Sequence, residues 1–370
     1  MIAHRASSRL TMWTAVTLLL PSLAGAQPLP YAELARRIAT ALKVWTGERV
    51  LLRVDPRTMP GLVPELRKAL EADGAMVETL AYGPASDLEA RLAATDIYIW
   101  LPAGQNAVTP PDQAAILARW LDQGRGREIH FHWGDGTRDP DGLPAVHSAA
   151  YDRVYVDALD IDYKALGLAM DRAIAMLRSG ETRVTTPAGT DLRFRVADRP
   201  FNKQDGDASK GRMTASKVRV DREIELPSGV LRVAPLEISA NGVIVIPSAR
   251  FGTARATNAR LVVENGVVTG SEAGQGLDAL QQFLKSEPGA SRFREFALGF
   301  NPKLVTPPGQ SALAYYGYGA GGVRLSLGDN EELGGIVRGG GVRWFFFPDA
   351  TVTVGERTLV DGGKLVIPNP

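Results

Sequence analysis

The sequence predicts a doubly wound parallel α/β region followed by a mainly antiparallel β region, and two observations support this division. Up to about residue 180, short apolar runs alternate with segments of helical apolar spacing, which is typical of a parallel sheet covered by helices. Beyond residue 180 the helical periodicity nearly disappears, and short β-rich runs are separated by turn residues. We therefore expect an α/β domain over residues 27–180 and a β-rich domain over residues 181–370.

In the first region each helix and strand follows from its apolar spacing. Leu34, Ile38 and Leu42 lie on one helical face, and Gly47 then ends that helix. The expected helices are 31–44, 60–73, 111–122 and 163–178, and the expected strands are 49–54, 75–80, 96–101 and 128–132.

In the second region turn residues mark the hairpins. Asn265-Gly266 is the strongest of these signals because both residues tolerate the positive φ angles of a tight hairpin turn. One helix, 277–285, interrupts the strands, and we interpret the polar stretch 202–217 as a loop. The expected strands flanking turns are 183–186, 191–196, 260–264, 267–269, 357–360 and 364–367.

Residues 1–26 have the features of a cleavable signal peptide. His4, Arg5 and Arg9 precede a short uncharged apolar run, and Ala24-Gly-Ala26 provides a small-residue cleavage site. The apolar run is too short for a membrane anchor, which needs about 20 residues. We expect a periplasmic or secreted protein without a membrane anchor.

Composition excludes several classes of function. The 42 Lys and Arg residues balance 41 Asp and Glu residues, so no basic excess indicates a nucleic-acid partner. The chain contains no cysteine, which excludes disulfides, thiol catalysis and a lipidated amino terminus.

Several motifs, in order along the second half, resemble the aminopeptidase T family of metallopeptidases. They are Leu-Pro-Ser-Gly at 226–229, Ala-Pro at 234–235, Asn-Gly-Val-Ile-Val at 241–245, Leu-Val-Val-Glu-Asn-Gly at 261–266, Arg-Glu-Phe-Ala-Leu-Gly-Phe-Asn at 294–301, Val-Arg-Leu-Ser-Leu-Gly at 323–328 and Gly-Val-Arg-Trp at 341–344. The resemblance implies a β domain of aminopeptidase T type, a peptidase activity that uses two metal ions, and dimers.

The residues at the positions of the family's metal ligands are mostly different here. Glu295 keeps the family's residue, whereas the other positions are occupied by Val230, Arg324, Glu331, Arg343 and Phe345. Valine and phenylalanine cannot coordinate a metal, and a protonated guanidinium repels a cation. We therefore expect no metal cofactor at this site, with a divalent metal such as zinc as the alternative.

The replacements themselves suggest a different kind of site. Arg324 and Arg343 would bring two guanidiniums beside Glu295 and Glu331, with Trp344 between the former ligand positions. Two arginines form a forked donor set that matches a carboxylate. We expect these five residues to form a pocket for a small anion or a peptide, with Glu295 ion-paired to Arg324 or Arg343.

A second candidate metal site lies in the first region. His130 and His132 flank Phe131 on one predicted strand, so both side chains point to the same face, and Asp135 follows in the next loop. Crevices at the carboxyl ends of parallel strands commonly bind ligands. The competing interpretation is that His130 lies inside the sheet.

Three functions remain open from the sequence. The first is a metal-free relative of the aminopeptidases that binds a small anionic or peptide ligand without converting it. The second is an active metallo-aminopeptidase with a rearranged metal site. The third is a structural protein that uses the scaffold for dimer contacts.

Overall fold

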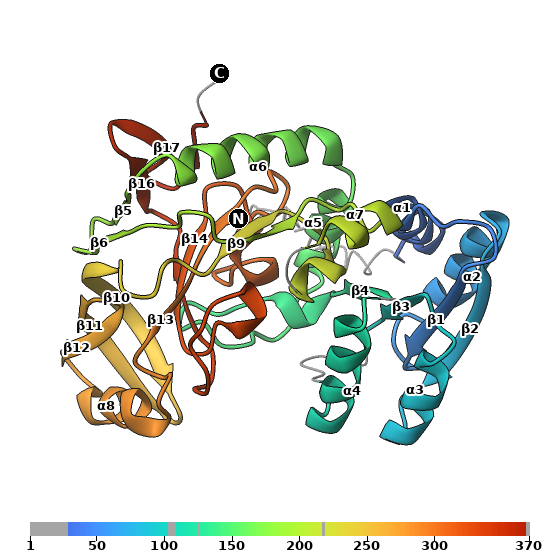
Figure 1. Cartoon of the computed structure of the whole chain (residues 1–370), viewed down its shortest axis with the longest axis horizontal. Coiled ribbons are helices and arrows are strands. Elements are labelled where there is room, and N and C mark those ends of the chain that lie inside the picture. The colour runs from blue at the N-terminus through green and yellow to red at the C-terminus, as the bar shows by residue number, and fades with distance from the viewer. Residues whose placement is uncertain (1–28, 103–108, 125, 217–218, 368–370) are drawn as a thin grey trace, which may run out of the picture.

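The computed structural model describes residues 29–102, 109–124, 126–216 and 219–367 (Figure 1). The leader expected over residues 1–26 lies outside these ranges, so it stays a prediction. Within the described ranges, no helix combines the length and the apolar composition needed to cross a membrane.

In the described part of the chain, five parallel strands form the first sheet, in the order β2-β1-β3-β4-β8. Four of them confirm the predicted strands of the first region, and the fifth comes from far along the chain. Their bounds are β1 Arg49–Val54, β2 Met76–Ala81, β3 Ile97–Trp100, β4 Arg127–Phe131 and β8 Glu223–Leu226.

Helices cover both faces of this sheet, because the central strand β3 is buried on both sides. The helices α1, α2 and α5 pack with Ile97 and Ile99 on one face, whereas α3 and α4 pack with Tyr98 and Trp100 on the other. Their bounds are α1 Tyr31–Leu42, α2 Leu62–Ala72, α3 Ala85–Leu92, α4 Pro111–Asp122 and α5 Ala150–Ala158. The doubly wound arrangement is therefore confirmed.

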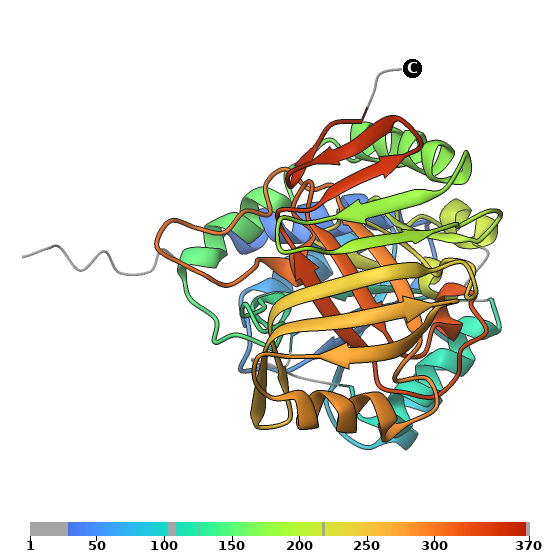
Figure 2. The same cartoon turned by 90° about the vertical axis from the view of Figure 1, so that its left-hand side faces the viewer.

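Two antiparallel sheets form the second region (Figure 2). In the larger sheet the strands follow the order β12-β11-β10-β6-β5-β16-β17-β18. Their bounds are β5 Thr182–Thr185, β6 Asp191–Phe194, β10 Asn241–Phe251, β11 Ala254–Glu264, β12 Val267–Glu272, β16 Thr351–Val354, β17 Arg357–Asp361 and β18 Lys364–Leu365. The smaller has the order β15-β14-β13-β9-β7, with bounds β7 Phe201–Gln204, β9 Val230–Val233, β13 Phe293–Gly299, β14 Val323–Leu327 and β15 Arg343–Phe347. The three predicted hairpins all belong to the larger sheet.

The largest apolar core lies between these two sheets. It contains Phe296 and Leu325 from the smaller sheet and Ile244 and Leu261 from the larger one. The helix α6 (Tyr163–Arg178) contributes Met170 to the same core, and Figure 1 shows it lying along the β region. The predicted helix 277–285 is α8 (Leu277–Ser286), which packs against β11 and β12.

The boundary expected at residue 180 does not separate the two regions in space. Strand β8 follows this boundary but pairs with β4 in the parallel sheet, and β9 then enters the small antiparallel sheet. A four-residue strand with two glutamates gives no periodicity that assigns it to one sheet. The polar stretch 202–217, expected as a loop, also contains strand residues of β7 and the short helix α7 (Lys210–Ala215).

The link from β8 to β9 joins the parallel and antiparallel sheets at Gly229. This glycine has φ +140°, and an ideal Cβ there would lie 2.4 Å from the Cβ of Asn301. The amide of Asn301 donates hydrogen bonds to the carbonyl oxygens of Ser228 and Ala158. A side chain at residue 229 would therefore disturb the contact between this link and Asn301.

We expect Gly229→Ala to lower the free energy of unfolding by about 2–4 kcal/mol, because it combines a forbidden φ with a steric clash. The control is Gly252→Ala, at φ +59° in the turn between β10 and β11 with no atom within 4 Å of the added methyl. It should cost only about 1 kcal/mol. Equal losses in urea denaturation of the two variants would contradict this explanation.

Candidate functional site: a buried ion-pair cluster facing the parallel sheet

One face of the small antiparallel sheet is polar, and the other contributes to the apolar core. Side chains alternate between the faces of a strand, so Phe296 and Leu298 point into the core whereas Glu295 and Ala297 point the other way. Register pairs Ala297 with Arg324 on β14 and with Arg232 on β9, which places both arginines on the face of Glu295.

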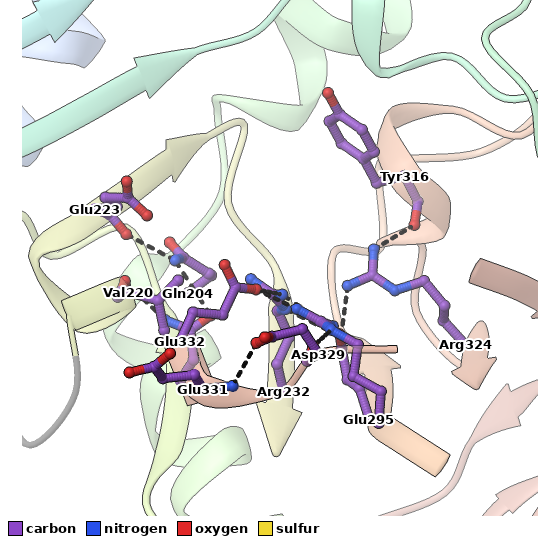
Figure 3. Close-up of polar contacts among 12 residues, drawn as sticks. Gln204, Val220, Glu223, Arg232, Glu295, Tyr316, Arg324, Asp329, Glu331 and Glu332 are labelled. Atoms are coloured by element: carbon purple, nitrogen blue, oxygen red, sulfur yellow. Dashed lines mark hydrogen bonds and ion pairs between the residues drawn. The ribbon is translucent and has the colours of Figure 1, made fainter. Parts of the chain in front are cut away.

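The carboxylate of Glu295 is fully buried and is surrounded by guanidiniums (Figure 3). Arg324 donates from Nη2 to Oε1 at 2.6 Å, and Arg232 donates from Nε to Oε1 at 3.0 Å and from Nη2 to Oε2 at 3.3 Å. Arg294 also donates to Oε2. The expected pairing of Glu295 with Arg324 is confirmed in this geometry.

Arg294 reaches this cluster although it is next to Glu295 in sequence. The pairing of β13 with β14 shifts between Phe293 and Glu295, so the strand is irregular at Arg294 and two consecutive side chains serve one cluster. Arg294 also donates to Oε1 of Glu332, as does Arg232 at 2.7 Å. Three guanidiniums and two carboxylates therefore form one network, which we call the arginine cluster: Arg232, Arg294, Arg324, Glu295 and Glu332.

The arginine cluster shifts the pKa values of its own members. Burial alone would raise the pKa of Glu332, but the guanidiniums of Arg232 and Arg294 outweigh it and hold this pKa at about 2. Burial lowers the pKa of Arg294 to about 10, with the neighbouring guanidiniums acting in the same direction and Glu332 opposing them. The network remains charged over the physiological range.

Arg343 does not belong to this cluster, which corrects the expected pair of Arg324 and Arg343. In β15 the register pairs Trp344 with Ser326 and Phe346 with Arg324, so Arg343 points to the opposite face. Its Nη2 donates to the carbonyl oxygens of Asp141 at 2.7 Å and Arg250 at 3.2 Å. The resemblance to the family's motif had suggested Arg343 for the site, but side chains alternate between the faces of a strand, and Trp344 and Phe346 lie on the face of Arg324.

Glu331 is also outside the cluster. Its side chain is half exposed and pairs with Arg338, whereas the next residue, Glu332, turns toward Arg232 and Arg294. Both glutamates lie in the short 3₁₀ helix Glu331–Leu333, where successive side chains point in different directions. The sequence indicated the right segment but the wrong carboxylate.

Trp344, the fifth expected residue, lies between two arginines. The guanidinium carbon of Arg324 is 4.9 Å from the centre of its ring, and that of Arg138 is 5.5 Å away. Arg138 also lies 4.5 Å over the ring of Tyr316. Arg138 is only 8% exposed, and its Nε is buried without a hydrogen-bond partner among the described residues.

The histidines of β4 share a face, as expected, and His130 also lies beside carboxylates that the sequence did not bring to it. The rings of His130 and His132 are 5.4 Å apart, and His132 also contacts Tyr315 and Tyr316. His130 Nε2 lies 2.6 Å from Oε1 of Glu128, and the ligand atoms of Glu128, His130 and Glu223 all lie within 4.8 Å of one another.

Asp135, the third expected metal ligand, belongs to the 3₁₀ helix Gly134–Gly136, and the structure does not describe its side chain.

The pKa values of Glu223 and His130 reflect the carboxylates that lie close to them. Burial and the Glu128 carboxylate raise the pKa of Glu223 to about 8. Burial would lower the pKa of His130, but Glu128 outweighs it and raises this pKa to about 10.

The residues that sequence reasoning missed carry few signals of their own. Arg232 lies between the motifs at 226–229 and 234–235, and Arg294 is the first residue of the motif at 294–301. Arg138 and Glu223 lie outside any motif, and only the fold brings them to the site.

A pair of metal ions does not fit the arginine cluster. Both oxygens of Glu295 accept hydrogen bonds from guanidiniums, and the neighbouring positions on this face hold Val230, Trp344 and Phe346. A cation there would have to displace guanidiniums from Glu295 and would meet their positive charge. The site therefore lacks the donors that a dinuclear centre requires.

Two solved structures share this architecture over nearly the whole of both chains. The 2,5-dihydroxypyridine dioxygenase from Pseudomonas putida is 18% identical, with a TM-score of 0.62, and the match covers 92% of this chain and 99% of that chain. AmpT from Thermus thermophilus is 16% identical, with a TM-score of 0.57, and the match covers 91% of this chain and 99% of that chain. The fold is therefore AmpT-like: a parallel α/β sheet followed by antiparallel β sheets.

Residues 165–310 match the family described as Thermophilic metalloprotease (M29). This segment is therefore similar to the Peptidase M29 domain of the aminopeptidase T family, which agrees with the motifs of the sequence. The matched segment includes Val230 and Glu295 but ends before Arg324. The comparison with curated proteins gave no match.

Removing the central carboxylate should destabilise the fold. We expect Glu295→Ala to lower the free energy of unfolding by about 3 kcal/mol or more, because it leaves buried guanidinium charge without its partner. The surface control Glu264→Ala, on an exposed strand position, should change this free energy by less than about 0.5 kcal/mol. Similar melting temperatures for wild type and Glu295→Ala would argue against a structural role for the cluster.

The low pKa of Glu332 predicts a specific acid sensitivity. The folded-state pKa of about 2 lies below the usual value of about 4.3 in an unfolded chain, so the folded state binds fewer protons between these values. The stability that Glu332 contributes should be complete above about pH 5 and be lost as the pH falls toward 2.

Urea denaturation at a series of pH values tests this expectation. The difference in unfolding free energy between wild type and Glu332→Gln should shrink as the pH falls from 5 to 2, while Glu264→Gln serves as the control for loss of one surface carboxylate. A difference that stays constant over this range would show that Glu332 does not titrate as its contacts indicate.

Proposed function

We propose that the protein is an exported, catalytically inactive relative of the M29 peptidases that binds a small anionic or peptide ligand through a carboxylate. Two features support the loss of metal-dependent catalysis. The arginine cluster takes up both oxygens of Glu295, and the same face of β15 presents Trp344 and Phe346 instead of metal ligands.

Arg138 is the residue that we expect to bind the carboxylate of the ligand. Burying a guanidinium without a counter-charge costs free energy, so such a group normally has a partner. Arg138 is buried over the rings of Tyr316 and Trp344 and has no carboxylate partner among the described residues. A ligand carboxylate would supply the missing charge and would accept the forked N–H groups of the guanidinium.

The aromatic neighbours favour an organic anion over a simple inorganic one. Tyr316, Trp344 and His132 form a run of ring contacts, with 5.7 Å between the ring centres of Tyr316 and Trp344 and 5.4 Å between those of His132 and Tyr316. Such rings offer apolar area beside the charged group, as in many small-molecule sites. A peptide or a small carboxylic acid combines both features.

The competing functions make different demands on the same residues. An active metallo-aminopeptidase needs a metal centre, and the arginine cluster disfavours a metal ion at Glu295. A structural role in dimers needs no ligand at Arg138.

The export proposal depends on residues 1–26 alone and is tested by amino-terminal sequencing of the mature protein.

Binding should depend on Arg138. We expect Arg138→Ala to weaken the binding of short peptides or simple carboxylates by at least about tenfold, or ~1.4 kcal/mol, as measured by isothermal titration calorimetry. The control is Arg260→Ala, which removes an exposed arginine on β11 that has no ion pair among the described residues. Equal binding by Arg138→Ala and wild type, or no binding by wild type, would refute the ligand proposal.

A further inference from the structure

A second polar cluster, separate from the arginine cluster, lies on the parallel sheet where β4 and β8 pair. Register places Glu128 directly opposite Glu223 and His130 directly opposite Glu225. Parallel strands in register align their side chains on one face, so these four groups form a compact square. The ligand atoms of Glu128, His130 and Glu223 lie within 4.8 Å of one another.

An unsatisfied oxygen at this cluster indicates a missing partner. Glu128 has no exposed surface, and its Oε2 has no hydrogen-bond partner among the described residues, while its Oε1 contacts His130. Buried polar atoms are nearly always paired, so an orphaned carboxylate oxygen indicates an additional water or ion. The Oε2 atom of Glu225, across the strand pair from His130, is also buried and has no hydrogen-bond partner in the part of the chain that the structure describes.

The charges of the cluster point to a cation. Three glutamates share one face of the strand pair with one imidazole, and the guanidiniums of Arg232 and Arg294 are already bound to Glu295 and Glu332. Like charges at this distance repel strongly in a buried site. A divalent cation would neutralise two carboxylates and give the orphaned oxygen of Glu128 a partner.

We propose that Glu128, His130 and Glu223 bind one divalent transition-metal cation, with Glu225 beside it. One imidazole nitrogen with carboxylate oxygens is a donor set that Zn²⁺ and similar ions accept. This set replaces the expected site of His130, His132 and Asp135: His130 is retained, and the strand pairing supplies carboxylates that the sequence did not bring together. The proposal does not depend on the ligand proposed at Arg138.

The test uses the full chain, purified without a polyhistidine tag, treated with a chelator and dialysed against Zn²⁺ alone. We expect wild type to bind one Zn²⁺ per chain, and Glu128→Gln and Glu223→Gln to weaken this binding by at least about tenfold. Glu332→Gln is the matched control, because it removes a carboxylate from the neighbouring arginine cluster and should retain the metal.

A second measurement guards against misfolded variants. Zinc X-ray absorption of wild type should show one imidazole together with oxygen ligands, and Zn²⁺ should raise the melting temperature of wild type but not of Glu223→Gln. Absence of bound Zn²⁺ in wild type, or unchanged binding in Glu128→Gln and Glu223→Gln, would overturn the proposal. Loss of metal in Glu295→Gln alone would instead place the ion at Glu295. That result would overturn both the metal site proposed at Glu128, His130 and Glu223 and the proposed loss of metal-dependent catalysis.

Discussion

The carboxylate of Glu295 lies at the centre of the small antiparallel sheet and has no exposed surface. Its charge is tolerated there because Arg232, Arg294 and Arg324 all donate to it. A buried carboxylate without such partners would cost several kcal/mol. The residues at 232, 294 and 324 are therefore constrained. Removing one guanidinium, or adding a cation, would change the balance of positive and negative charge in the whole cluster.

The fold of this protein and the residues of its polar face have to be considered separately. The M29 match and the AmpT-like architecture concern the backbone, the core and the order of the strands. The polar face of the small sheet carries fixed positive charge from Arg232, Arg294 and Arg324. Because a fold does not determine a function, the function proposed for this protein depends on the site residues and not on the fold.

The two polar clusters lie on different sheets but are electrostatically linked. Glu225 of β8 and the buried hydroxyl of Tyr318 lie between them, and burial together with the charge of Glu225 raises the pKa of Tyr318. Strand β8 and Gly229 connect the two sheets through the backbone. A cation at Glu128, His130 and Glu223 would lie on the parallel sheet, across this link from the arginine cluster.

Local pattern was sufficient to predict the alternating strands and helices of the first region, the hairpin at Asn265-Gly266 and the aminopeptidase T motifs, because periodicity and turn chemistry act over a few neighbouring residues. The pairing of Glu295 with an arginine also followed from charge. The tertiary structure alone decided that β8 joins the parallel sheet, that Arg343 points away from Glu295, and that Glu223 meets His130. These outcomes depend on strand register and on pairing between distant segments, and a shift of one residue exchanges the two faces of a strand.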